Sequence, residues 1–169
     1  MTGIVLFLLD RSTADHLAAD PAAFADQHDI ELAPHESTAV MIAAATAQML
    51  AKGDAVRPWG GYLALGGPRR RVVGTGGFKG DPDATNSVEV AYFTFPGEEG
   101  RGVATAMAQA LVRLAGEAHA EVLIVCAHTL PERTASSRVL ENAGFKQVST
   151  VLDPVDGPVW RWELRVRAS

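Results

Sequence analysis

Apolar and polar positions follow two rhythms along the chain, and these predict the order of its strands and helices. Short apolar runs predict strands at residues 4–9, 59–65, 71–78, 88–95, 121–128, 147–152 and 159–166. Apolar residues at helical spacing predict helices at residues 12–18, 22–29, 37–52, 103–118 and 131–143. The order predicts a mixed α/β sheet, largely antiparallel, with one parallel strand–helix–strand unit at its centre.

The segment 98–105 joins the strand at 88–95 to the long helix after it. Pro96 and Gly97 end the strand, because proline lacks a ladder donor and glycine permits turn geometry. A loop that leads from a strand into a helix presents free N–H groups and the positive end of the helix dipole, which suits a phosphate. The segment is neither a P-loop nor a dinucleotide fingerprint. A tight turn that holds two glycines is the alternative that the spacing leaves open.

A second glycine-rich segment lies at residues 74–80, where glycine occupies four positions. No helical pattern follows it, so the dipole and amides that bind a phosphate are missing. Glycines inside a strand more often mark bulges or close backbone approach. We therefore expect a structural role for this segment.

Composition and charge narrow the class of protein. The 169 residues are 47% hydrophobic and 21% charged, which predicts one folded domain over residues 1–169. A net charge of −5 gives no general attraction to nucleic acid or to an anionic membrane. The apolar run at 4–9 is too short to span a bilayer and lacks a basic leader, so a cytoplasmic protein is expected. The single cysteine excludes an internal disulfide, and the histidines have no metal-ligand spacing, so no metal is predicted.

Five segments stand in an order and spacing typical of one known family: residues 77–80, 88–92, 96–105, 131–145 and 160–164. From about Val72 to Leu164 the chain resembles the GNAT superfamily of acetyl-CoA-dependent N-acyltransferases. Within it, the nearest resemblance is to the branch that includes ribosomal-protein N-terminal acetyltransferases. The first 60 or so residues match less well, which is where the superfamily varies its acceptor site.

The resemblance implies the GNAT fold, with acetyl-CoA as acyl donor and an amine as acceptor. It implies a coenzyme A site formed by Phe93, Thr94, Gly100, Arg101, Gly102, Val103, Ala104, Thr105, Arg133 and Ser136. In this family the loop amides cradle the pyrophosphate and the preceding strand pairs its backbone with the pantetheine arm. That strand splays from its parallel neighbour to admit the thioester, and a backbone N–H there is suited to polarise the carbonyl.

Three residues depart from the family pattern. Glu99 stands where the loop usually begins with Gln or Arg, and its carboxylate would repel a pyrophosphate unless it turns to solvent. Arg133 replaces an Asn and either reaches a phosphate or lies on the surface. Leu140 replaces the tyrosine that commonly protonates the departing thiolate, which leaves the general acid unassigned.

Acyl transfer to an amine requires a proton acceptor, because an alkyl ammonium has a pKa of about 10. Glu89 is our candidate base, in the family's Val-Glu-Val pattern, and partial burial near Tyr92 and Phe93 is expected to raise its pKa. The alternative is a structural carboxylate. Cys126 is expected to be a buried, inert thiol, and His128 a hydrogen-bonded histidine at a strand end.

These observations predict an N-acetyltransferase that moves an acetyl group directly from acetyl-CoA to a primary amine in a ternary complex. The acceptor remains open among protein N-termini, amino acids, polyamines and amine drugs. Two alternatives are a catalytically weak coenzyme A-binding regulatory module and a structural partner domain. A homodimer through the last strands is a further possibility.

Overall fold

The computed structural model describes residues 3–53, 57–118 and 121–167. Its strands are β1 (Val5–Leu9), β2 (Gly61–Gly66), β3 (Arg71–Phe78), β4 (Ser87–Thr94), β5 (Ile124–Thr129), β6 (Lys146–Asp153) and β7 (Gly157–Arg165). They form one sheet in the order β1-β2-β3-β4-β5-β7-β6. Only β4 and β5 pair in parallel among these strands. The predicted mixed sheet with a central parallel unit is confirmed.

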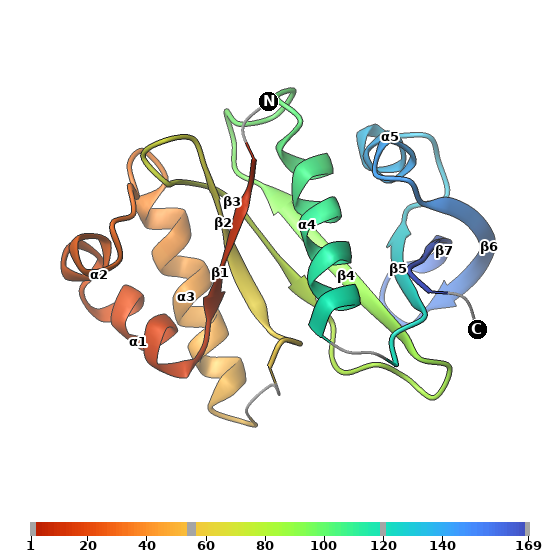
Figure 1. Ribbon diagram of the computed structural model, residues 1–169, viewed down its shortest axis with the longest axis horizontal. Coiled ribbons are helices and arrows are strands. Elements are labelled where there is room, and N and C mark those ends of the chain that lie inside the picture. The colour runs from red at the N-terminus through yellow and green to blue at the C-terminus, as the bar shows by residue number, and fades with distance from the viewer. Residues whose placement is uncertain (1–2, 54–56, 119–120, 168–169) are drawn as a thin grey trace.

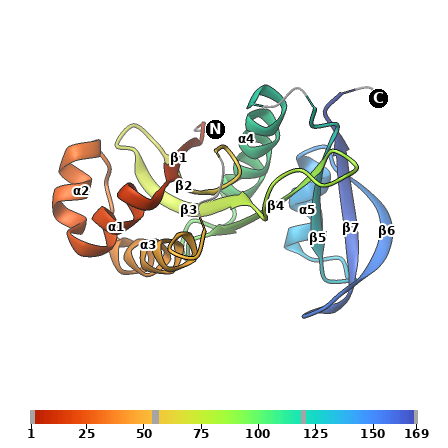
Figure 2. The same cartoon turned by 90° about the horizontal axis from the view of Figure 1, so that it is seen from below.

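Five helices of the described residues accompany the sheet: α1 (Arg11–Ala19), α2 (Pro21–His28), α3 (Glu36–Leu50), α4 (Val103–Ala118) and α5 (Ala135–Asn142). The first three cover one face of the part formed by β1, β2 and β3, and α4 covers the other face (Figure 1, Figure 2). Alternation along β2 explains the two layers, since Leu63 packs with the first three helices and Tyr62 packs with Leu111 of α4.

Helix starts are where the sequence prediction was wrong. Asp10 caps α1, because its carboxylate accepts from Thr13 N–H at 2.9 Å, so the helix begins at Arg11 instead of residue 12. The last helix begins at Ala135 instead of Pro131. There Ser137 Oγ accepts a hydrogen bond from the N–H of Thr134 at 2.9 Å. Such local hydrogen bonds decide where a helix begins more finely than apolar spacing does.

Close backbone approach at the glycines of β3 is confirmed. A Cβ atom at Gly74 would lie 2.6 Å from the carbonyl oxygen of Phe93, and one at Gly77 would lie 2.5 Å from that of Gly60. Neither position has room for a side chain, so glycine is required there for packing. The glycines of β3 therefore have the structural role expected from the sequence.

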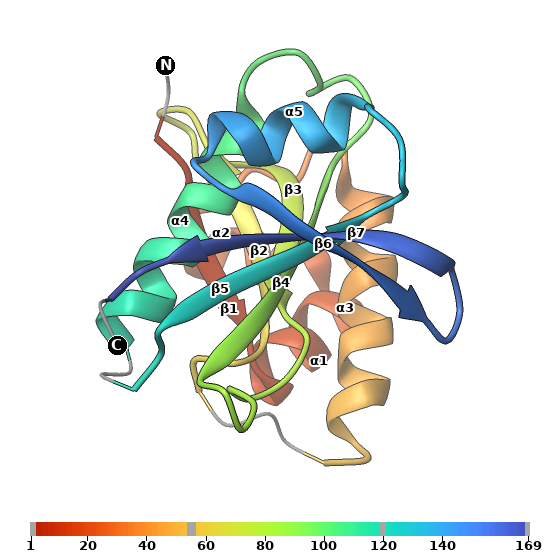
Figure 3. The ribbon, with the colours of Figure 1, turned by 90° about the vertical axis from the view of Figure 1, so that its right-hand side faces the viewer.

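The sheet divides at its centre. β4 pairs with β5 at only three positions, the last being Glu89 opposite Cys126, and the rest of β4 pairs with β3 alone. In Figure 3, β5, β7 and β6 lie nearest the viewer, with α4 and α3 on opposite sides of the strands behind them. The predicted splay of β4 from β5 is therefore present.

None of the helices in the described part of the chain has the length and apolar character needed to cross a bilayer. Within the same residues, His, Cys, Asp and Glu side chains form no group of three or more arranged to hold a metal ion.

Candidate functional site

The loop between β4 and α4 turns on three glycines in the left-handed region. Gly97, Gly100 and Gly102 have φ values of 88°, 73° and 77°, which side chains on other residues disfavour. The turn ends at α4, where Ala106 N–H donates to the carbonyl of Gly102 at 3.0 Å. Ala106 is therefore the first helical donor, and the N–H groups of the three residues before it have no acceptor within the helix. They lie at its positive end.

A cavity of about 490 Å³ lies beside this loop. Its walls come from the end of β4, the loop with the first turn of α4, and one side of α5: Tyr92, Phe93, Thr94, Glu98, Glu99, Gly100, Gly102, Val103, Ala104, Thr105, Ala135, Ser136, Arg138, Val139 and Asn142. We call it the loop cavity. It brings together all of the residues predicted for coenzyme A binding except Arg101 and Arg133.

Arg138, Val139 and Asn142 are among the residues of the loop cavity that were missed from the sequence. They follow Ala135 at helical spacing, so they lie on one side of α5. That spacing was a signal that could have found them once α5 was placed against the loop.

Thr94 gives the cavity an unsatisfied polar atom. Its buried Oγ1 has no hydrogen-bond partner among the described residues, although Thr94 lines the loop cavity. Buried hydroxyl groups normally have a partner. An orphaned hydroxyl beside a loop rich in free N–H groups fits a site for a polar, phosphate-bearing ligand such as coenzyme A.

Arg101 and Arg133 point elsewhere. Arg101 Nη1 lies 3.2 Å from Glu98 Oε2, and Arg101 lines a separate cavity of about 360 Å³ with Arg71. Arg133 Nη2 donates to Glu141 Oε2 at 2.9 Å. Their roles in coenzyme A binding stay predictions.

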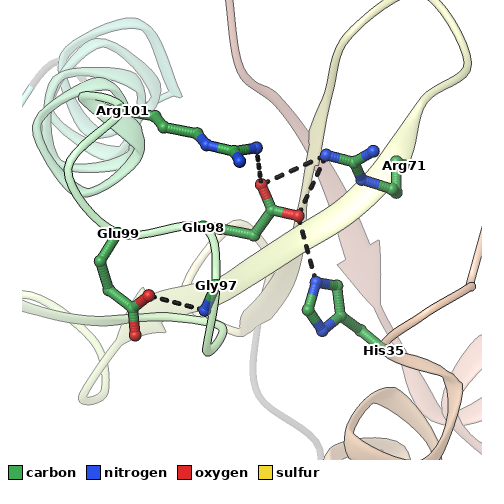
Figure 4. A network of polar contacts seen from close by, with 6 residues as sticks. All are labelled: His35, Arg71, Gly97, Glu98, Glu99 and Arg101. Atoms are coloured by element: carbon green, nitrogen blue, oxygen red, sulfur yellow. Dashed lines mark hydrogen bonds and ion pairs between the residues drawn. The ribbon is translucent and has the colours of Figure 1, made fainter.

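Glu98 is the centre of a polar network under the loop, shown in Figure 4. Only 5% of Glu98 is exposed, and its carboxylate lies 3.2 Å from His35 Nε2 and 3.0 Å from Arg71 Nη2. Burial alone would raise the pKa of Glu98, but His35 and the two arginines outweigh it and hold the pKa below its ordinary value. From the sequence we considered Glu99 beside the phosphate and assigned no role to Glu98.

Glu99 folds back on its own loop. Its Oε2 accepts a hydrogen bond from the N–H of Gly97 at 2.6 Å, and its side chain is exposed at the rim of the loop cavity (Figure 4). The carboxylate therefore borders the cavity without filling it.

Glu89 lies at the point where β4 and β5 separate. Its Oε1 is 2.8 Å from Lys79 Nζ and 2.9 Å from His128 Nδ1. Burial raises the pKa of Glu89, but the bonds to Lys79 and His128 more than offset this and lower it overall. The expectation of a raised pKa is wrong, because it considered burial without these two partners.

A second cavity, of about 480 Å³, lies next to this group. It is lined by Lys79, His128, Thr129, Leu130, Thr134, Ser136, Asp153, Asp156 and Val159, and we call it the hairpin cavity. Ser136 lines both the loop cavity and the hairpin cavity. The two cavities therefore border the same residue at the start of α5.

Cys126 lies as the sequence predicted, and Leu140 belongs to the core. Cys126 is a buried free thiol, and burial raises its pKa to about 11, which leaves it protonated and unreactive at neutral pH. Leu140 is 1% exposed and packs in the core with Phe145 and Trp162. Position 140 therefore presents no hydroxyl group to a ligand.

Comparison with known proteins agrees with this geometry. The sequence profile of the family described as "Acetyltransferase (GNAT) domain" matches residues 7–146. The match extends into the N-terminal part, where the resemblance was expected to be weak. No curated protein sequence matches the chain.

Solved structures share the fold at low sequence identity. A spermidine N-acetyltransferase chimera of Vibrio cholerae SpeG and hSSAT is 13% identical, with a TM-score of 0.66, covering 96% of this chain and 95% of its own. A Vibrio cholerae protein provisionally described as a ribosomal-protein-serine acetyltransferase is 14% identical, with a TM-score of 0.66 and coverage of 96% and 94%. AAC(6')-Ib in complex with acetyl-CoA is 17% identical, with a TM-score of 0.63 and coverage of 96% and 93%. With the family profile matching most of its length, the chain belongs to the GNAT acetyltransferase family.

Proposed function

We propose that this chain transfers an acetyl group from acetyl-CoA to a primary amine, by direct attack in a ternary complex within a single domain. The observation that carries the proposal is the separation of β4 from β5 after Glu89, with the loop cavity and the hairpin cavity both bordered by Ser136. A donor bound on one side of this gap and an acceptor on the other would meet in the middle.

The loop cavity would take the coenzyme. The N–H groups of Gly100 to Thr105 suit its pyrophosphate, with the Thr105 hydroxyl as a further donor. The edge of β4 that leaves β5 is free to pair with the amide groups of an extended pantetheine arm at Phe93 and Thr94. Bound in this way, acetyl-CoA would supply a thioester carbonyl at the gap in the sheet.

The hairpin cavity would take the amine. Asp153 and Asp156 contribute two negative charges to its wall, against one positive charge from Lys79. This balance favours a cationic acceptor over an anionic one. The similar solved structures include a spermidine N-acetyltransferase and an aminoglycoside acetyltransferase, which supports the amine class without choosing within it.

Two measurements test the proposal in turn. Acetyl-CoA should raise the melting temperature, because a ligand selective for the folded state stabilises it. The protein should then release free coenzyme A when mixed with acetyl-CoA and one member of a panel of N-terminal peptides, amino acids, polyamines and aminoglycosides. If acetyl-CoA stabilises the protein but no amine causes release of coenzyme A, the regulatory module is favoured. If acetyl-CoA does not stabilise the protein, both the acetyltransferase and the regulatory module are contradicted.

We also propose a homodimer through the last strands. β6 is an edge of the sheet, and Val148 and Leu152 on it are 52% and 80% exposed. Exposed apolar residues on an edge strand favour pairing with a second copy. A molar mass of one chain by light scattering at micromolar concentration would contradict this.

A further inference from the structure

His128 stands between Glu89 and the hairpin cavity. Its Nδ1 lies 2.9 Å from Glu89 Oε1, and His128 itself lines the cavity, whereas Glu89 is not among the residues that form the cavity wall. Lys79 Nζ lies 2.8 Å from the same carboxylate oxygen. The carboxylate is therefore engaged by two partners, and the imidazole is the group of this pair that borders the space for an acceptor.

The hydrogen bond fixes which nitrogen of His128 is basic. An ionised carboxylate only accepts hydrogen bonds, so the bond to Glu89 requires a hydrogen on Nδ1. In the neutral imidazole the lone pair must then be on Nε2. No described residue partners this nitrogen, which leaves it available to a ligand.

Resting on the proposed function, we infer that His128 Nε2 accepts the proton of the acceptor ammonium, and that Glu89 orients the imidazole and stabilises its charged form. Lys79 keeps the carboxylate ionised and in place. The sequence-based choice of Glu89 as the direct base becomes a positioning role in this arrangement, since His128 is the group that touches the acceptor.

The protons balance across the reaction. The ammonium gives one proton to His128, which passes it to solvent through the hairpin cavity. The neutral nitrogen then forms a bond to the thioester carbonyl carbon as the bond from that carbon to sulfur breaks. The nitrogen loses its second proton, and the leaving sulfur takes up one proton. The sum is amide, free thiol and one proton released.

Charged groups on every neighbouring element face this imidazole. Glu89 of β4 and the hairpin aspartates Asp153 and Asp156 favour the imidazolium. Lys79, which follows β3, opposes it, and so does Arg161, the residue paired with His128 across β5 and β7. Glu89 contacts the imidazole directly and is itself paired with Lys79, so we use a pH profile of activity as the readout of the His128–Glu89 pair.

The test compares two variants with the wild type over pH 5 to 9, using the amine found active in the panel. His128→Asn keeps an N–H that can reach Glu89 but has no base, so kcat/KM should fall 10²- to 10⁴-fold. The fall of kcat/KM at low pH, the acidic limb of the profile, should vanish in this variant. Glu89→Gln keeps an acceptor for Nδ1–H but loses the charge, so kcat/KM should fall less than in His128→Asn and the profile should keep an acidic limb. The dissociation constant for acetyl-CoA should stay within about two-fold in both.

The opposite pattern overturns the inference. If Glu89 is itself the base, His128→Asn keeps its acidic limb and most of its turnover, while Glu89→Gln loses both. Nitrogen-15 NMR of the wild-type imidazole gives an independent readout that needs no substrate. We expect the Nδ1–H tautomer at high pH for His128, and the Nε2–H tautomer would refute the dyad. Failure of the proposed function is distinct, since it would appear as no coenzyme A release by the wild type.

Discussion

Glu98 and Arg71 lie 3.0 Å apart at their nearest side-chain atoms, which ties the loop before α4 to the start of β3. Because Glu98 is buried and also contacts His35 and Arg101, one carboxylate joins the loop to two other parts of the fold. The backbone N–H groups that we propose for phosphate binding belong to this loop. Their positions therefore depend on the ion pairs of the buried Glu98 carboxylate.

Replacing Glu98 should loosen the loop. We expect Glu98→Gln to lower the free energy of unfolding by about 2–3 kcal/mol, since it removes the buried negative charge that pairs with Arg71 and Arg101. Part of the effect is screened because both arginines reach water. Urea unfolding measures this, and the dissociation constant for acetyl-CoA should rise in parallel. Glu99→Gln is the matched control in the same loop. Equal stability losses in both variants would contradict the role given to Glu98.

Glu98 should also make the free energy of unfolding depend on pH in the acidic range. The pKa of Glu98 is below its ordinary value of 4.5 in the folded protein. A carboxyl group with a depressed folded pKa stabilises the protein above its unfolded pKa, and this contribution is lost as pH falls through the folded value. The stability difference between wild type and Glu98→Gln should therefore be constant above pH 5.5 and shrink below pH 4.5. A difference that grows on acidification would reverse the sign and refute the assignment.

Gly74 should resist substitution for steric reasons. The Cβ atom of Gly74→Ala would meet the carbonyl oxygen of Phe93 at 2.6 Å and Met107 Cε at 3.0 Å, so β3, β4 or α4 must shift. We expect a loss of about 2 kcal/mol in the free energy of unfolding, read as a melting temperature lower by roughly 4–8 °C. Gly61→Ala is the control, because nothing lies within 4 Å of its Cβ position. An equal loss at Gly61 would show that glycine loss alone, without the clash, explains the effect.

Prediction from sequence succeeded where the signal is local and failed where it depends on partners. Apolar spacing gave the strands, and Gly100 and Gly102 gave the turn into α4, because both are properties of neighbouring residues. Glu89 was singled out from the sequence as a candidate base, but its lowered pKa was not foreseen. Lys79 lies ten residues earlier and His128 thirty-nine residues later in the chain. The burial of Glu98 depends in the same way on His35, 63 residues away. Charge pairs across a sheet leave no periodic pattern in a sequence.

Arg133 was predicted to bind coenzyme A from the family resemblance, but the structure places Arg138, not Arg133, at the loop cavity. Arg138 lines the loop cavity, whereas Arg133 pairs with Glu141 and lies outside it. For Arg133 to reach a phosphate it would have to leave that carboxylate, and the exposed pair stabilises the protein little. We therefore expect Arg138 to supply the positive charge near the phosphates.

Alanine substitution distinguishes them by calorimetry. Arg138→Ala should raise the dissociation constant for acetyl-CoA about five-fold at low ionic strength, equivalent to about 1 kcal/mol, and added salt should narrow the gap because it screens an exposed charge. Arg133→Ala should stay within about two-fold of wild type, because it removes a side chain bound to Glu141. If Arg133→Ala is the weaker binder of the two, then Arg133 leaves Glu141 when the coenzyme binds, and the position inherited from the family pattern is the functional one.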